Sequence, residues 1–395
     1  MIADIAYIAL AALVFFIVIS SLIFFHELGH YSVGRFFGIK VERFSIGFGR
    51  PILKRTAKSG TEWTLSRIPL GGYVKFAGDA GAASNPDTEA LEQIRAEQGD
   101  VSDIFHFRPV WQRALVVLAG PVANFILAAV LFGIALFWIG QRDTAAIVGE
   151  VEAGTPAAAA GLQPGDEIIR MDGKDISGWT AMSQYVMLRS GTPIDTVVLR
   201  DGREIDMTLE PRRVDDRDFV GGKMTRGQIG IRTRSNPEII YTRYGPLEAL
   251  GAGAGQVVDT ITVTGHYIGR IFTGREDGKQ LGSIGRIAAM TGKSTTDIAR
   301  AEQPVGQKIK ALLYRMLQLG AGISVALGFA NLMPIPMLDG GHLVYYGYEA
   351  VARKPLSQRA QEMGFRFGMA VILALFVVLT INDIGYIGSI FTGSG

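Results

Sequence analysis

The 395-residue chain contains no cysteine. This absence excludes disulfide bonds, thiolate metal ligands and a cysteine nucleophile, so any metal must be held by His, Asp or Glu. The chain also lacks a lysine-rich tail or a basic block interleaved with aromatic residues, and its formal charge is only +2. No nucleic acid partner is therefore expected. Charged residues make up only 19% of the chain and hydrophobic residues 48%. This composition argues against an ordinary soluble enzyme and indicates that part of the chain lies in lipid.

Four apolar segments approach the roughly 20 residues that a helix needs to cross a bilayer core. They run from Ile5 to Phe25, Ala114 to Gly140, Met316 to Leu338 and Phe367 to Ile381. Pro334 and Pro336 should end the third helix early, and the fourth segment is short enough to need flanking groups such as Arg366 to snorkel. The first segment lacks the basic start and cleavage site of a secretory signal, so we expect a retained span.

Lysine and arginine near the span ends predict the orientation. Neither residue occurs in the first 34 positions or after Arg366, whereas the loops after the first and third spans are basic. Both termini are therefore expected outside the cytoplasm. On this topology "HELGH" at the end of the first span and "NLMPIPMLDGGH" at the end of the third reach the same, cytoplasmic leaflet.

The first of these motifs has the spacing of a zinc peptidase. His26 and His30 lie four residues apart and share one face of a helix, where both can bind one ion, while Glu27 sits beside it. In such enzymes the metal lowers the pKa of a bound water to about 7 and the glutamate takes its proton during attack on a carbonyl. HExxH also arises by chance in soluble helices, but three ionisable groups within a span have no cheap structural role.

A third protein ligand is required for zinc, and Asp339 is the expected one. Two prolines before it would take the chain out of helix and let the backbone turn toward the site. The alternative for Asp339 is an ordinary turn aspartate, and His342 is the second choice as ligand. His106 and His266 are expected to be surface or interfacial histidines.

Two asparagines fall at the same expected depth. Asn124 belongs to "LAGPVANF" near the start of the second span, and either contacts substrate or only bonds a neighbouring helix. Asn331 stands eight residues before Asp339 and is expected to hold a substrate backbone or an oxyanion.

The water-exposed parts contain strands, a loop and a helix. "FSIGFGRPILKR" and "TEWTLSRIPLGGYVKFAGD" alternate apolar and polar residues, which predicts a small membrane-associated β-sheet at the inner face. A substrate helix must unwind before cleavage, and we expect these strands, at Gly71 and Gly72, to pair with the unwound stretch. Residues 78–103 are expected to form a loose loop, and residues 244–273 an interfacial helix.

The segment from Ala146 to Ile176 reads as strand, turn, short Ala-rich helix, tight turn and strand. Its core, "AAGLQPGDEIIRMDG", resembles a PDZ domain of the bacterial protease type, the alternative being an unrelated αβ module. The domain should end near Arg212 after a hairpin around Asp201 and Gly202, and should lie on the periplasmic side. PDZ domains bind extended peptides by strand addition.

HELGH, GPVAN, the PDZ-like core and NLMPIPMLDGG together resemble the site-2 protease family of intramembrane zinc metalloproteases, closest to the bacterial regulator-of-sigma-E protease branch. The resemblance implies Zn²⁺ held by His26, His30 and Asp339, Glu27 as base and Asn331 in substrate handling. It also implies a membrane-reentrant β-loop around residues 68–76. The best-studied members of this branch carry two tandem PDZ domains, and only one clear copy is found here.

The same resemblance implies the setting of the activity. The expected location is the bacterial inner membrane. The substrates would be single-span proteins cut in or near the bilayer, either an anti-sigma factor already trimmed by an upstream site-1-type protease or remnant signal peptides. A rival of another class is a catalytically silent membrane-anchored PDZ scaffold, against which the presence of Glu27 speaks. A transporter is weaker, since the spans show no internal repeat.

The predicted fold is thus a polytopic α-helical membrane protein with four transmembrane helices, an inserted α+β PDZ domain and a small membrane-associated β-sheet. The expected order is span one with HELGH (1–37), a cytoplasmic-side loop with strands (38–110), span two (111–141), the PDZ domain (142–213), a linker with an interfacial amphipathic helix (214–306), span three with the Asp339 motif (307–342), and a cytoplasmic loop with span four (343–395).

Overall fold

A computed structural model describes residues 2–81, 87–98, 101–217, 223–235, 237–275, 278, 282 and 284–392. The chain divides into two compact units. The first, here the membrane unit, comprises residues 1–135, 250–261 and 287–378. The second, here the strand-rich unit, comprises residues 136–249, 262–286 and 379–395.

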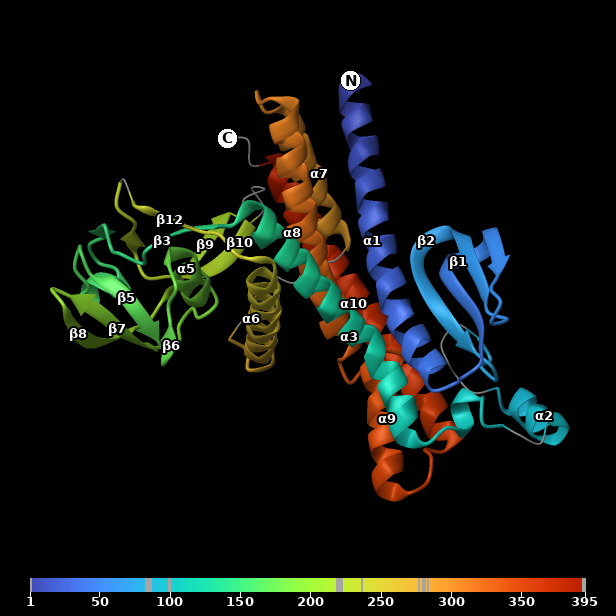
Figure 1. Ribbon diagram of the computed structural model, residues 1–395. Coiled ribbons are helices and arrows are strands. Elements are labelled where there is room, and N and C mark those ends of the chain that lie inside the picture. The colour runs from blue at the N-terminus through green and yellow to red at the C-terminus, as the bar shows by residue number, and fades with distance from the viewer. Residues whose placement is uncertain are drawn as a thin grey trace. The chain divides into compact units, whose positions relative to one another are not determined.

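Four long helices dominate the chain: α1 (Ile2–Phe36), α3 (Val110–Ile139), α8 (Val305–Asn331) and α10 (Gln358–Thr392) (Figure 1). By length and composition each contains a stretch able to cross a membrane, namely Phe16–Phe36, Val110–Ile139, Val305–Asn331 and Gln358–Gly385. Within the described part of the chain, the prediction of four helices long and apolar enough to span a membrane is confirmed. The fourth is longer than its apolar run suggested, because helix begins well before Phe367 and continues past Ile381.

A coiled hairpin packs against α1. It consists of β1 (Val41–Thr56) and β2 (Glu62–Phe76), which confirms the two predicted strands (Figure 1). The first part of β1 pairs with both ends of β2: Phe44, for example, lies opposite both Val74 and Trp63. The sheet therefore curls back on itself. Gly71, at φ +125°, lies where the register of the two strands shifts. On its outer side the segment from Gly72 to Phe76 pairs with no further strand among the described residues. That segment therefore forms an edge.

Apolar side chains at the base of this hairpin join it to the start of α3. Their buried members are Ile39, Val41, Phe44, Val74, Phe76, Phe105, Val116 and Val117. Between hairpin and α3, the segment expected to be a loose loop contains the helix α2 (Thr88–Gln98), and the short 3-10 helix η1 (Phe105–Phe107) follows that segment. The expectation of a loop is therefore wrong for residues 88–98, while residues 82–86 and 99–100 lie outside the described part.

The strand-rich unit is an antiparallel β module with two short helices. Its central sheet has the order β6 (Lys174–Asp175), β5 (Glu167–Met171), β7 (Ile194–Arg200), β8 (Arg203–Leu209). Three two-stranded pairs surround it: β3 (Gln141–Thr144) with β12 (Ile239–Thr242), β4 (Glu150–Val151) with β11 (Ile231–Arg232), and β9 (Arg212–Arg217) with β10 (Lys223–Gln228). The helices are α4 (Pro156–Ala159) and α5 (Trp179–Met187).

The expected hairpin is present, since Asp201 and Gly202 both have positive φ and join β7 to β8. This geometry suits a two-residue turn whose twist matches the strands. The sequence ended the module near Arg212, but β11 pairs with β4 and so extends it to Arg232. A core around Ile168, Met171, Met182, Ile194 and Val198 holds sheet and helices together.

Two further helices, α6 (Pro246–Phe272) and α7 (Ile284–Arg300), precede α8. The helix predicted over residues 244–273 is present, although its middle packs on membrane spans. A side chain at Gly253 would lie 2.4 Å from the Ala129 carbonyl oxygen of α3, and Val257 joins a buried cluster with residues of α3 and α8. The helix α7 was not foreseen. The chain then re-enters helix at α9 (Asp339–Ala352).

Candidate metal centre

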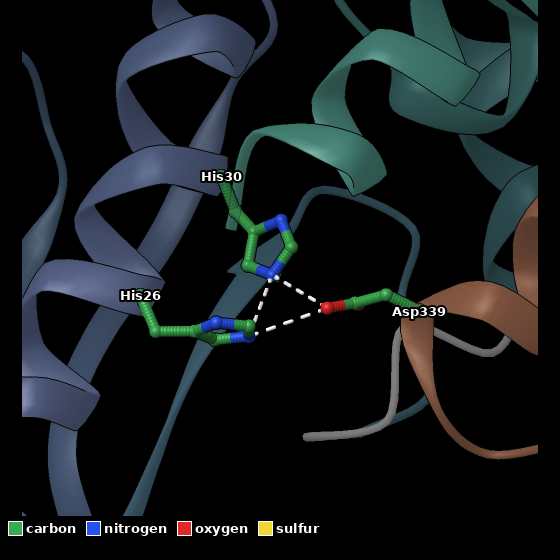
Figure 2. A group of neighbouring side chains, drawn as sticks. All are labelled: His26, His30 and Asp339. Carbon is green, nitrogen blue, oxygen red and sulfur yellow. Dashed lines mark hydrogen bonds and ion pairs between the residues drawn. The ribbon is translucent and has the colours of Figure 1, made fainter. Parts of the chain in front are cut away.

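Three side chains from two distant segments converge on one point (Figure 2). His26 and His30 project from α1 with their Nε2 atoms 3.2 Å apart. Asp339, the first residue of α9, brings Oδ2 within 3.3 Å of His26 Nε2 and 3.6 Å of His30 Nε2. All three ligand atoms lie within 4.8 Å of one another. The structure thus brings together the residues that the sequence proposed as ligands.

The path of Asp339 into this cluster depends on a tight break between α8 and α9. Helix α8 ends at Asn331, where Leu332 N–H donates back to Gly328 and Phe329 carbonyls. A side chain at Gly340 would lie 2.3 Å from the Leu332 carbonyl oxygen, and one at Gly341 would lie 2.4 Å from that of Ile335. The two glycines after the aspartate are therefore required by the fold of this turn.

Helix α3 forms the wall behind the histidines. A side chain at Gly120 would lie 2.3 Å from His30 Nε2, and one at Gly29 would lie 2.3 Å from the Ala119 carbonyl oxygen. Only glycine at both positions lets α1 and α3 approach closely enough. His30 Nδ1 is 2.9 Å from the Val116 carbonyl oxygen. Because that carbonyl can only accept, Nδ1 carries the proton and the Nε2 lone pair faces the cluster.

The donor set fits a zinc ion. Asp339 Oδ2 is buried and makes no hydrogen bond to any described residue, although it approaches two imidazole nitrogens. A buried carboxylate oxygen without a donor is costly unless a cation accompanies it. Two imidazole nitrogens, one carboxylate oxygen and an open fourth position form the ligand set of catalytic zinc sites.

Glu27 lines the same pocket as the three clustered residues and is held by a backbone group of β2. Its carboxylate accepts a hydrogen bond from the backbone N–H of Val74 in β2. A side chain at Gly72 would lie 3.2 Å from Glu27 Cγ and 2.9 Å from Ile23 Cγ2. The edge of β2 thus passes directly beside the glutamate.

One pocket collects most of the predicted site. Its lining includes the three clustered residues together with Glu27, Gly71, Gly72, Asn331, His342 and Tyr346. Asn331 holds Nδ2 3.3 Å from His26 Nε2. His342 lines the pocket but does not belong to the group within ligand distance. The structure therefore favours Asp339 over His342 as the third ligand.

Two further polar residues are not among those that line the pocket. Asn124 is completely buried and its amide lies 3.0 Å from His26 Nδ1 of α1, which agrees with the second of its two expected roles, a bond to a neighbouring helix. His106 is not a surface histidine, because only 12% of its side chain is exposed and Nε2 lies 2.7 Å from Asp79 Oδ1. The two partners are 27 residues apart, and no sequence pattern signalled their pairing.

Comparison with known proteins gives one consistent result. The sequence profile of Peptidase family M50 matches residues 14–375. Metalloprotease MmpA of Caulobacter vibrioides is 43% identical over 388 residues, which cover 95% of this chain and 97% of the relative. Relatives from Agrobacterium fabrum (41% identity, 94% of each chain) and Rhizobium meliloti (39% identity, 94% of this chain and 96% of the relative) bear names of zinc metalloproteases.

Proposed function

Since the chain belongs to Peptidase family M50, the site-2 proteases, and is a membrane-embedded zinc metalloprotease, we propose that its centre is the cluster of His26, His30 and Asp339 with Glu27 as general base. The observation that carries this proposal is the convergence of the three ligand atoms beside Glu27 on one pocket. Bound zinc would supply a Lewis acid and a water of lowered pKa. Glu27 accepts the proton of the attacking water, and Asn331 orients the carbonyl under attack.

The substrate is a single-span membrane protein that unwinds locally at the site. A peptide bond in an intact helix is shielded and its backbone groups are already paired. Among the described residues no further strand pairs with the edge from Gly72 to Phe76, so an unwound stretch can add there as a strand beside Glu27. Gly71 and Gly72 leave the start of this edge without side chains.

The expected setting is the bacterial inner membrane, with lipid as the direct surroundings of the four spans. The basic loops support a metal centre near the cytoplasmic leaflet and both termini in the periplasm. The substrates are an anti-sigma factor first cut by an upstream site-1-type protease, and remnant signal peptides. These assignments rest on charge distribution and on the family resemblance.

Residues 142–213 of the strand-rich unit, with the strands β10 and β11 that follow them, are interpreted as a single PDZ domain on the periplasmic side. Its order of strand, Ala-rich helix, tight turn and strand supports this interpretation, as does the closing pair of β4 and β11. The unit either binds a substrate end by strand addition or excludes substrates whose outer part is large.

The test uses the detergent-purified full-length protein and a single-span substrate. Wild type is compared with Glu27→Gln and with wild type plus a zinc chelator. We expect product to be lost in both altered samples, with a loss of about 10²–10⁴-fold for Glu27→Gln, while Glu27→Gln retains its zinc. Cleavage by Glu27→Gln at the wild-type rate would refute the role of Glu27. Zinc-loaded wild type that cleaves neither intact nor pre-trimmed substrate would favour the scaffold alternative.

A further inference from the structure

The histidines of the metal centre need a fixed tautomer, and this inference rests on their proposed role as ligands. A neutral imidazole has one N–H and one lone pair. The nitrogen that binds a metal must present its lone pair, so the other nitrogen carries the proton and requires an acceptor behind the ring. Both Nε2 atoms face the cluster, so each Nδ1 needs such an acceptor.

For His30 the acceptor is the Val116 carbonyl oxygen of α3, at 2.9 Å from Nδ1. For His26 the neighbouring group is the side-chain amide of Asn124, two turns further along the same helix. Its Nδ2 is placed 3.0 Å from His26 Nδ1, while Oδ1 is buried and has no hydrogen-bond partner among the described residues.

The two orientations of this amide differ in what they permit at His26. If Nδ2 donates to Nδ1, the ring proton must sit on Nε2 and blocks metal binding. Amide oxygen and nitrogen have nearly the same shape, so their placement follows from the hydrogen-bond network. Turning the amide by half a rotation puts Oδ1 on the Nδ1–H of His26 and leaves the Nε2 lone pair free for zinc.

We propose that Asn124 is a positioning residue of the metal centre, whose Oδ1 accepts the Nδ1–H of His26 and holds this ring in the metal-binding tautomer. Helix α3 then supports both histidines, through a backbone carbonyl at Val116 and a side-chain amide at Asn124. The amide is well held for this task. The side chain has little room to move because Asn124 is fully buried. Separately, the backbone carbonyl of Asn124 accepts a hydrogen bond from Ser324 Oγ of α8 at 2.8 Å.

The experiment measures zinc affinity rather than cleavage, by chelator competition with the purified full-length protein. Asn124→Leu removes the acceptor while keeping a branched side chain, and Asn124→Asp restores an oxygen that can only accept. We expect zinc affinity to fall about 10–100-fold in Asn124→Leu and to return to within several-fold of wild type in Asn124→Asp. The absorption spectrum of the cobalt-substituted protein should change in Asn124→Leu and not in Asn124→Asp.

Ser324→Ala is the matched control, because it removes the neighbouring buried hydrogen bond without touching the amide. Its zinc affinity should equal that of wild type. If Asn124→Leu does not fold, Asn124→Ala repeats the test without added bulk, and the thermal unfolding of the metal-free forms reports folding separately. Wild-type affinity in the Leu or Ala variant, or equal loss in Asn124→Asp, overturns the proposal.

The variant His26→Ala distinguishes failure of this inference from failure of the proposed metal centre on which it rests. If His26→Ala binds zinc as tightly as wild type, the proposed centre itself is wrong. If His26→Ala loses zinc while Asn124→Leu does not, only the role of Asn124 fails.

Discussion

Two carboxylates, one in each unit, are treated in opposite ways by the fold. Asp166 in the strand-rich unit is 1% exposed, and both its oxygens are satisfied, by Arg200 at 2.6 and 2.7 Å and by the backbone N–H of Gln163 at 2.8 Å. Asp339 in the membrane unit has a buried oxygen with no hydrogen bond from the described residues. A carboxylate that only stabilises the fold is fully paired, whereas one left without donors beside two imidazoles awaits a cation.

Exchanging these two aspartates for asparagine gives the largest expected effects and tests the comparison directly. Asp339→Asn should lose cleavage by about 10³-fold or more and lose stoichiometric zinc, because a neutral amide is a poor zinc ligand. Asp166→Asn should keep wild-type zinc content. Zinc measured by mass spectrometry in both purified variants checks this, and retained zinc in Asp339→Asn would contradict the assignment of Asp339.

A smaller loss is expected at the strand edge beside the metal centre. Gly72→Val places atoms against the Ser45 carbonyl oxygen and the Glu27 side chain, so cleavage should fall about 10²-fold with zinc still bound. Gly255→Ala, in helix α6 where an added Cβ meets no atom within 4 Å, is the control and should cleave normally. Unchanged turnover in Gly72→Val would remove the strand-addition part of the proposed function.

The residues in and around the metal centre also show which features can be predicted from a sequence alone and which cannot. The His26 and His30 pair could be predicted because helical periodicity alone puts four-residue neighbours on one face. Asp339 could be predicted only by adding the orientation of two spans, which placed both motifs at one depth. Asn124 was identified, but contact with substrate and a bond to a neighbouring helix both stayed open, because its burial behind His26 depends on how α1, α3 and α8 pack. The pairing of Asp79 with His106 had no local signal at all.

The strand-rich unit gives the next prediction, a stability effect. Asp166→Asn removes the charged partner of Arg200 from a buried position, which should lower the stability of this unit. Hydrogen exchange of the β5 and β7 amides, measured in the full-length protein, should accelerate accordingly. Leu199→Ala offers a comparison, since it lies in β7 opposite Glu167 and perturbs packing without breaking the ion pair.

The same aspartate should make this unit sensitive to acid. Burial would raise the pKa of Asp166, but the hydrogen bonds from Arg200 and Gln163 outweigh burial and hold that pKa below its ordinary value of 3.8. A lowered pKa in the folded state means that the carboxylate contributes stability above pH 3.8, and that this contribution is lost as the pH falls through the folded-state pKa. Protection of β5 should drop below about pH 4 in wild type and change less in Asp166→Asn. An equal drop in both would assign the acid sensitivity to other groups.

The smallest effect sharpens the comparison by changing exposure alone. Arg170 on β5 pairs with Glu204 on β8 in the same sheet, but the two side chains are 38% and 55% exposed. Water and salt screen such a pair, and two long side chains lose freedom to form it, so its net contribution is about 0–1 kcal/mol. Glu204→Gln should therefore leave hydrogen exchange in β5 and β7 almost unchanged. If Glu204→Gln accelerated exchange as much as Asp166→Asn does, burial would not explain why one ion pair stabilises the sheet and the other does not. The contrast between Asp166 and Asp339 would then rest only on the number of hydrogen-bond donors around each carboxylate.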